Sequence, residues 1–486
     1  MSTTGSILSI ARSAIGAQQL ALQTISQNIA NAETEGYSRQ RAELVARTPQ
    51  RLTAGNVGTG VDVRGVVRMR EELLDSAFRR DVAGREQSSV RQDIMASIEE
   101  ILGEPSSTGL ANTLDEFWNS WSDLSNNPSS AAAQSVVRQR GTQVAHTLND
   151  YSTRIADVAN RTRASIASTV DEVNALARRF ADLNRQITTA EVGGIQAPDL
   201  RDARDRISDQ LSQLVGARVD TQKNGTVAVY VGTTMLVDAA NARPLELRGG
   251  TNPSVGFVGD PDPVHGIGGS VGAMLRVVDV DVPAVVARLD DFARGVVNGV
   301  NEYHASGWTA AGDALGGGNW IAATGPTGSR VNFFDPAFTT AATMRLSAAV
   351  TADAAVIAAG DVQNAPGNNT VALALGGLRD DAGMAALQAR MGAAFATQIG
   401  FATGVSFGDH YTQTASDLGV SVADAHDQFA IYDTLAKQSD NRRAAVNGVS
   451  LDEELTLLMR HQQAYAAATK LVSVADEMAQ SILAMI

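Results

Sequence analysis

The chain has 486 residues, of which 44% are hydrophobic and 5% aromatic, so it is long enough for about two to four domains. Its 53 Asp and Glu residues outnumber its 39 Lys and Arg residues, and the formal net charge of −14 argues against binding to nucleic acid. The absence of cysteine excludes disulfides, thiolate metal sites and cysteine nucleophiles.

The first ten residues have neither a basic start nor a long apolar core, so they do not resemble a Sec-type signal peptide. If the protein leaves the cell, we expect an export route that cleaves no such signal. No stretch resembles a transmembrane span, and the amphipathic ends lack the Lys and Arg enrichment of interfacial helices, so no membrane is expected as a partner.

The first predicted element is an amphipathic helix from about Ser6 to Asn31. Its apolar stripe repeats in sevens, with smaller or polar residues beside it: Leu8, Ile15, Leu22 and Ile29, flanked by Ala11, Gln18 and Ile25. This alternation of three and four residues keeps one seam facing a partner helix.

The segment from Ser26 to Arg41 is the most specific stretch of the sequence. It ends the first helix at Asn31, turns through Gly36, and continues as an extended stretch that carries Tyr37 and Arg39. A left-handed turn after a helix is the usual place for glycine, so a change of chain direction is predicted here.

A strand-like stretch from Gly58 to Arg68 comes next, and three long helices are predicted beyond it. They cover Glu71–Leu102, Thr142–Val192 and about His410–Val446. The second of these contains neither glycine nor proline, and a helix of about 45 residues would span about 70 Å at 1.5 Å per residue.

The middle of the chain has a different pattern. Apolar and polar residues alternate on both sides of Asn224-Gly225, which predicts a β-hairpin with a type I′ turn: Ala217, Val219 and Thr221 before it, then Val227, Val229 and Val231. Loops rich in Gly and Pro follow, and a helix from Pro283 to His304 interrupts them. The stretch from about 306 to 380 matches no recognisable pattern.

The last predicted helix follows Gly448, and Ser450 with Glu453 forms a capping box that would start it. It repeats in sevens like the first helix: Leu451, Leu458, Tyr465, Val472, Ala479 and Ile486, joined by Ala468, Ala475 and Ile482. Neither terminal helix can bury its stripe alone, so we expect the two helices to pair with each other or with neighbouring subunits.

These elements predict a mainly α fold with an inserted β-rich domain. It would be a long antiparallel helical rod whose N- and C-terminal helices pair as a coiled coil. The predicted domains are a discontinuous terminal coiled coil (1–45 with 447–486), a discontinuous long-helix bundle (46–216 with 381–446) and a β-containing outer domain (217–380).

The apolar stripes of the terminal helices contain few large residues. Burying the four large apolar residues of the first helix would offset little of the conformational entropy that is lost when about 26 residues become ordered. We therefore expect the termini to fray in the monomer and to become ordered in a tubular stack of copies. The predicted assembly residues are Leu8, Ile15, Leu22, Ile25, Ile29, Asn31, Gly36, Tyr37, Arg39, Leu451, Leu458, Tyr465, Val472, Ile482 and Ile486. The alternative is an ordinary intramolecular coiled coil inside a monomer.

The segment from Ser26 to Arg41 resembles the signature of flagellar rod, hook and hook-associated proteins, an Asn-hydrophobic-Ala-Asn core followed by a Gly-aromatic pair. Its Ser-Arg-Gln ending is similar to the hook-associated protein 1 family, and Glu35 stands where rod and hook subunits more often have Pro. The stretches Gly58–Arg68, Asp199–Val215 and Gly448–Leu455 resemble the same family in the same order.

The resemblance implies a structural subunit at the junction between hook and filament. Such a subunit would be exported by the flagellar type III system, with a chaperone on its C-terminal helix, and would polymerise through its terminal helices. The implied partners are other copies of the chain, the hook protein, a second hook-associated protein and the export chaperone. The implied location is outside the cell, in the bacterial flagellum.

No catalytic, metal or cofactor pattern competes with this interpretation. The six histidines form no zinc spacing, no phosphate loop is present, and adjacent carboxylates such as Asp290-Asp291 are typical of a solvated surface. We therefore expect neither an enzyme nor a cofactor. The remaining alternatives are a flagellar hook or rod subunit and a secreted coiled-coil adhesin.

Overall fold

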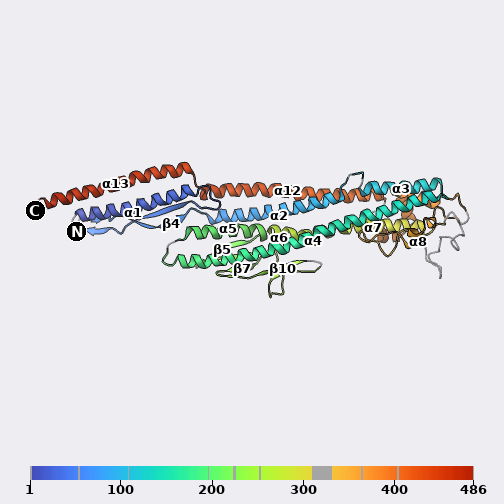
Figure 1. Cartoon of the computed structure of the whole chain (residues 1–486), viewed down its shortest axis with the longest axis horizontal. Helices are drawn as coiled ribbons and strands as arrows, with labels where there is room; N and C mark the ends of the chain where they lie inside the picture. The colour runs from blue at the N-terminus through green and yellow to red at the C-terminus, as the bar shows by residue number, and fades with distance from the viewer. Residues whose placement is uncertain are drawn as a thin grey trace.

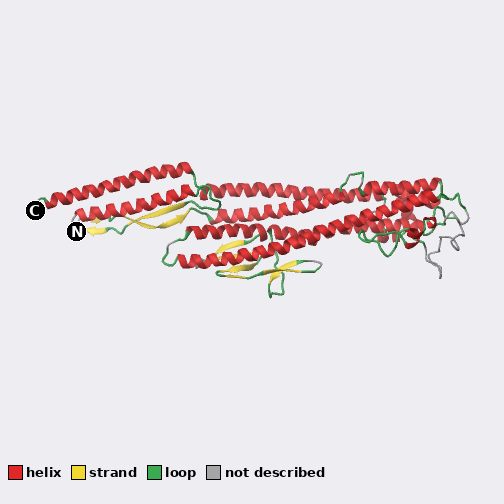
Figure 2. Cartoon of the chain, in the orientation of Figure 1, coloured by secondary structure: helices red, strands yellow, loops and turns green. Residues whose placement is uncertain are grey.

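A computed structural model describes residues 3–52, 55–104, 106–107, 109–194, 196–222, 226–250, 253–308, 331–362, 365–401 and 404–484. Within these ranges the chain forms an elongated bundle of helices that lie along one another, with both chain ends at the same tip (Figure 1). Helices dominate, and strands occur beside the terminal helices and beside the middle of the rod (Figure 2).

The terminal helices pair as predicted. Helix α1 (Thr3–Ala30) runs antiparallel to α13 (Leu451–Leu483), and the two lie side by side at one end of the molecule (Figure 1). Helix α1 buries mainly small residues in this contact, among them Ala11, Ala17 and Ala21. The predicted coiled-coil pairing is therefore confirmed, and the most buried side chains of α1 include alanines beside the predicted stripe.

A twisted ribbon connects the terminal pair to the rod. Strand β1 (Gln40–Ala46) pairs antiparallel with β4 (Val61–Arg68), and the short strands β2 (Gln50–Leu52) and β3 (Gly55–Val57) pair beyond them. The predicted strand after Gly58 is thus confirmed. Its partner strand, β1, begins within the signature segment, at Gln40.

Long helices build the rod. Their bounds are α2 (Glu72–Leu102), α3 (Leu110–Asn126), α4 (Ala131–Ala190), α5 (Pro198–Val215) and α12 (Phe407–Asn447). Helices α2 and α12 lie side by side along much of their length, and α4 runs the length of the rod (Figure 1).

Helix α4 corrects one prediction, because it begins at Ala131 rather than near Thr142 and has 60 residues. The helix passes through Gly141, which lies in a buried position. A Cβ atom at Gly141 would lie 2.5 Å from the Phe333 ring, so the missing side chain makes room for an aromatic neighbour. Packing outweighs the low helix propensity of glycine here.

The strands of the middle region lie against α4 and follow the predicted hairpin pattern (Figure 2). They are β5 (Arg218–Thr221), β6 (Val227–Val231), β7 (Thr234–Asp238), β8 (Asn241–Ala242), β9 (Leu245–Arg248) and β10 (Ser254–Phe257). Strands β5 to β8 form one antiparallel sheet in sequence order, and β9 pairs with β10. The predicted turn at Asn224-Gly225 lies outside the described residues.

Beyond residue 257 the described chain is again mainly helical, and it includes the helix predicted from Pro283 to His304. Helix α6 (Gly269–Arg276) continues through a π-helical turn, η1 (Val277–Asp281), into α7 (Val282–His304). Pro283 lies in the first turn of α7, directly after the π-helical turn, where the regular α-helical hydrogen-bond ladder is already interrupted. The short helices that follow are α8 (Ala348–Ala352), η3 (Ala354–Val356), α9 (Thr370–Gly376), η4 (Gly377–Arg379), α10 (Asp381–Met391) and α11 (Ala394–Gln398).

Two hydrophobic clusters stabilise the rod, and they group the chain differently from the three predicted domains. One joins α4 and α5 to the strands and α6 through residues such as Phe180 and Val229. The other joins α3, α7, α12 and residues 331–401 around the buried rings of Phe117, Trp118 and Trp121. The exact domain division therefore stays a prediction, but residues 217–274 and 277–380 pack into different clusters.

One buried histidine makes the second cluster sensitive to acid. The His304 side chain is fully buried, its Nδ1 lies 2.9 Å from the Val331 carbonyl oxygen, and its Nε2 accepts a hydrogen bond from the Ala358 N–H. The ring is therefore neutral, with its proton on Nδ1. Burial lowers the pKa of His304 from 6.5 to about 4.

We expect the stability of this cluster to fall as the pH drops from about 6.5 to about 4, because the unfolded chain then binds a proton that the folded chain excludes. A difference of this size corresponds to about 3 kcal/mol. The substitution His304→Gln should remove that part of the pH dependence. Urea unfolding followed by the fluorescence of Trp118 and Trp121 measures it, with exposed His146→Gln as the control. An unchanged pH dependence in His304→Gln would contradict the assignment.

Candidate assembly site at the base of the terminal helices

The end of α1 meets the start of β1 and of α13 around one buried amide. The Asn28 side chain is 1% exposed. Its Oδ1 accepts hydrogen bonds from the Tyr37 hydroxyl at 2.9 Å and from the Gln40 N–H at 3.0 Å. Its Nδ2 donates to the Gln40 carbonyl at 2.9 Å and to Glu454 Oε2 at 3.0 Å. Asn28 thus uses its full hydrogen-bonding capacity to join three segments.

The turn between α1 and β1 depends on glycine. Gly36 has a φ of 74°, in the left-handed region that side chains with a Cβ disfavour. A Cβ atom there would lie 2.4 Å from Cδ of Arg206 on α5. Both the backbone angle and the close approach of α5 therefore require the residue that the signature supplies.

Arg39 ties this turn to the start of α13. Its Nε donates to Glu454 Oε1 at 2.8 Å, and its Nη1 donates to Glu453 Oε2 at 2.8 Å. Its backbone N–H donates to the carbonyl of Asn447, the last residue of α12. The Glu454 side chain is 1% exposed, so Arg39 supplies the charge that a buried carboxylate needs. Glu453, predicted to cap α13, makes this contact instead.

The Tyr37 side chain is partly buried near several negative charges. Burial, together with the negative charges of Asp199, Asp202 and Glu454, raises the pKa of Tyr37 to about 12. The hydroxyl therefore stays protonated and serves as a hydrogen-bond donor to Asn28. It is a structural contact and not a general base.

Helix α5 presents a row of aspartates to the same region. Asp202 accepts hydrogen bonds from the Ser38 N–H at 3.0 Å and from the Ser38 hydroxyl at 2.6 Å. Arg68, the last residue of β4, donates to both Asp202 at 2.6 Å and Asp205 at 2.7 Å. The signature segment and the returning ribbon are thereby fixed to the same face of α5.

The row continues toward α2 and α12. Asp205 also pairs with Arg70 at 2.9 Å, while Asp209 pairs with Arg79 of α2 at 2.8 Å and with Arg443 of α12 at 2.7 Å. We call the three aspartates Asp202, Asp205 and Asp209, with the four arginines Arg68, Arg70, Arg79 and Arg443, the α5 clasp. Its four arginines exceed its three aspartates by one charge, and Asp75, which lies 2.7 Å from Arg70, balances it. Such balance is a requirement for ionic groups that are largely removed from water.

Asp205 lies at the centre of the clasp. Burial alone would raise the pKa of this carboxyl, but the positive charges of Arg70, Arg68 and Arg79 outweigh that effect and hold its pKa below the ordinary value. Asp205 is therefore ionised throughout the neutral range. The clasp serves to hold segments together, and no nucleophile or substrate-sized cavity adjoins Asp205 among the described residues.

The predicted assembly residues occupy two kinds of position. Ile25 is buried in the α1–α13 contact at 6% exposure. Half-buried positions are taken by Ile15, Leu22, Ile29, Asn31, Tyr37, Arg39, Leu458, Tyr465 and Val472. Exposed positions are taken by Leu8, Gly36 and Leu451. The Ile482 side chain and Ile486 lie outside the described residues. Whether these residues contact other subunits stays a prediction.

Sequence reasoning missed Asn28, Glu454 and the aspartates of α5. The spacing of Asp202, Asp205 and Asp209 by three and four residues places them on one helix face, which was a usable signal for a common partner surface. No comparable signal linked them to Arg68 or Arg443, because those partners are distant in sequence.

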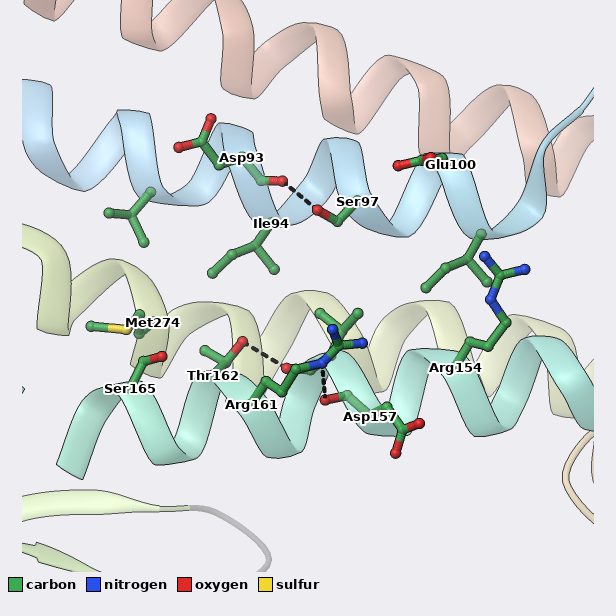
Figure 3. A pocket seen from close by; sticks show the side chains of 13 residues that line it. Asp93, Ile94, Ser97, Glu100, Arg154, Asp157, Arg161, Thr162, Ser165 and Met274 are labelled. Carbon is green, nitrogen blue, oxygen red and sulfur yellow. Dashed lines mark hydrogen bonds between the residues drawn. The ribbon is translucent and has the colours of Figure 1, made fainter. Parts of the chain in front are cut away.

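A separate surface groove of about 550 Å³ lies between α2 and α4 (Figure 3). Asp93 and Glu100 come from α2, Arg154 and Arg161 come from α4, and apolar residues such as Ile94 and Met274 also line the groove. Ser97 donates to the Asp93 carbonyl of its own helix. No nucleophile lies next to a base among these lining residues, so the groove presents no catalytic arrangement.

The described residues hold no group of three or more His, Asp or Glu side chains placed to bind a metal ion. Within the same ranges, no helix has the length and hydropathy needed to cross a bilayer. What remains is a rod of long helices whose chain ends pair at one tip and are fixed to the rod by buried ionic contacts. These features define a helical-rod fold with paired chain ends.

Comparisons with known proteins identify the family. The family model described as flagellar hook-associated protein FlgK helical domain matches residues 95–318. The model for the flagellar basal body rod FlgEFG protein C-terminal region matches residues 445–485, and the flagella basal body rod protein model matches residues 8–37.

Relatives of similar length agree. The chain is 30% identical to flagellar hook-associated protein 1 of Bacillus subtilis, with 99% of this chain and 98% of that protein aligned. It is 29% identical to flagellar hook-associated protein 1 of Escherichia coli, over 64% of this chain and 59% of that protein. The flagellar hook junction protein FlgK from Burkholderia pseudomallei shares the fold, with a TM-score of 0.60 and 14% identity over 78% of this chain and 100% of that chain.

The chain belongs to the flagellar hook-associated protein 1 family. It is a structural protein of the bacterial flagellum and not an enzyme, as the sequence predicted. The resemblance of the signature to this family is confirmed, and the alternatives of a hook or rod subunit and of an adhesin are set aside.

We expect Asp205→Asn to destabilise the contact between α5, β4 and α2 by about 3 kcal/mol, because it leaves buried arginines without their central carboxylate. Hydrogen exchange of the backbone amides in these elements measures the change.

The matched control is Asp220→Asn, whose pair with Arg218 is exposed and should contribute less than about 1 kcal/mol. Because the pKa of Asp205 is lowered in the folded chain, the contact should weaken in the wild type as the pH falls through that lowered pKa. Equal exchange rates in the Asp205 variant and the wild type would show that the clasp does not stabilise the rod.

Proposed function

We propose that the chain forms a layer at the junction between hook and filament, that the flagellar type III system exports it, and that it polymerises through α1 and α13. The relatives named hook-associated protein 1 and the hook junction protein with the same fold support the place of assembly. The composition of the terminal helices supports the mode of assembly.

The observation that carries this proposal is that the terminal pair buries small side chains and exposes large apolar ones. Alanines are the most frequent of the buried side chains of α1 and α13 in the described residues, among them Ala11, Ala21, Ala468 and Ala475. Large apolar residues of the same helices are exposed instead: Leu8 at 47%, Leu451 at 48%, Leu455 at 48%, Met459 at 57%, Leu471 at 45%, Val474 at 40% and Met478 at 39%.

Such an exposed apolar surface has a physical consequence. Burying one leucine or methionine side chain contributes roughly 1.5–3 kcal/mol, so covering several of them would exceed what the alanine seam provides. Clusters of exposed large apolar side chains are typical of sites of contact with other proteins. The terminal pair thus has more to gain from neighbouring copies than from its own seam.

The proposed partners follow from the proposed place. Other copies of the chain would cover the terminal helices, the hook protein would lie on one side of the layer, and the second hook-associated protein would lie on the other. An export chaperone would hold α13 before assembly, since an amphipathic helix with exposed Leu471 and Met478 needs protection from aggregation. The rod and its strands would face outward.

Deletion of the gene tests the junction role. We expect hooks without filaments in electron micrographs and unpolymerised filament protein in the medium. Complementation with Leu471→Asp should restore export but not filaments, because a charge replaces a side chain that neighbours would bury.

The control variant is Leu373→Asp, at an exposed position of α9 near the opposite end of the rod, which should restore filaments. Normal filaments in the deletion strain would refute the junction role. Normal filaments with Leu471→Asp would refute polymerisation through this surface.

The thin seam also predicts behaviour in the isolated monomer. We expect backbone amides of residues 6–31 to exchange with solvent much faster than those of α4, because alanine contacts offset little of the entropy of ordering two long helices. Hydrogen exchange on the monomer, followed by the same measurement on assembled particles, reveals the difference. Strong protection of residues 6–31 in the monomer would count against assembly-coupled ordering.

A further inference from the structure

The base of the rod carries a groove that the terminal pair of the same chain leaves open. It lies between α2, α12 and the loops that carry Gly216 and Gly268, and it has a volume of about 960 Å³. We call it the basal groove. Its apolar side chains include Leu73, Tyr432 and Leu435, which are 72%, 38% and 40% exposed.

The groove is built into the fold and does not result from loose packing. A Cβ atom at Gly84 of α2 would lie 2.5 Å from the Tyr432 ring, so the ring lies directly against the backbone of α2. A Cβ atom at Gly216 would lie 2.9 Å from Cα of Gly268, so the two loops on the other wall are also in close contact. The side chains that form this shape cannot easily move to fill it.

The rim of the groove is basic, although the chain as a whole carries a net charge of −14. Arg80 and Arg218 line it with side chains that are 79% and 67% exposed. Arg442 of α12 lines it as well, is exposed, and forms no ion pair within the described ranges. A segment that fits here should present apolar side chains flanked by a carboxylate.

The first turns of α13 have that composition. Leu451, Leu455 and Met459 are 48%, 48% and 57% exposed, and their spacing of four residues places them along one ridge of the helix. Asp452 is exposed beside this ridge and forms no ion pair in the part of the chain that the structure describes. We call these four residues the α13 ridge.

A chain cannot place the α13 ridge in its own basal groove. Leu435 precedes the end of α12 at Asn447 by 12 residues, or about 18 Å of helix. Helix α13 then continues past that end and away from the groove (Figure 1). The occupant must come from another molecule.

We propose that the basal groove receives the α13 ridge of a second copy of this chain. The apolar ridge covers Leu73, Tyr432 and Leu435, and Asp452 of the second copy lies against Arg442. This inference rests on the proposed assembly into a layer and specifies one contact within it. Charge and apolar character both match, which steers the two surfaces together and excludes a reversed orientation.

The natural absence of cysteine permits a direct test by crosslinking. Two differently tagged full-length copies, one with Leu435→Cys and one with Leu455→Cys, are expressed together in the deletion strain, and hook–filament particles are treated with a short bismaleimide. We expect a covalent dimer carrying both tags in particles and none in the monomeric protein. Leu373→Cys paired with Leu455→Cys is the control and should give no dimer, because α9 packs on α3 rather than near the groove.

Charge reversal tests the polar contact. Arg442→Asp and Asp452→Arg should each lower the dimer yield about tenfold, and the two changes together should restore it.

The outcomes separate the two proposals. Three results would overturn the groove contact and leave the junction role intact. They are particles that form without a 435–455 dimer, particles that give as much dimer with the Leu373 control, and a crosslink from position 435 to a different protein. Normal filaments without the chain would refute the junction role itself.

Discussion

The buried ionic contacts of the α5 clasp are the constraint on which the rest of the architecture depends. The chain reaches the clasp or its neighbourhood at three points: after α1, at the end of β4 and near the end of α12. Ser38 and Arg68 contact Asp202, and Arg443 contacts Asp209. Because charges removed from water must be paired, the loss of one partner would expose the others to a large desolvation cost. This linkage gives the terminal pair a defined starting point on the rod.

The two ends of the molecule are stabilised by different means. The far end of the rod packs large rings, with the centroids of Phe117 and Trp118 4.9 Å apart and those of Trp121 and Phe333 5.4 Å apart. The terminal pair packs alanines and leaves large residues outside. An aromatic core buries large apolar surfaces within the chain, whereas alanine side chains bury little. The far end of the rod therefore has more buried apolar surface per residue to stabilise it than the terminal pair has.

The sequence allowed the helices and the β-hairpin to be predicted, because periodicity, glycine and proline act locally. A predicted element boundary was wrong where tertiary contacts determine the end of the element. Helix α4 runs through Gly141 because the Phe333 ring fills the space that a side chain would need. The described core residues between 277 and 380 pack on the rod with α3 and α12, a grouping that no local pattern reports.

The candidate site shows the same division. Gly36, Tyr37 and Arg39 were found because the signature segment combines a helix end, a turn and an extended stretch within a few residues. By itself the sequence determined the paired amphipathic ends, the family and the absence of cysteine chemistry. Only the tertiary structure decided that Asn28, Glu454 and Asp205 hold the ends to the rod and that the alanines form the seam. Those roles depend on which side chains come into contact although they are hundreds of residues apart in the sequence. They also depend on which of these side chains are removed from water by the fold.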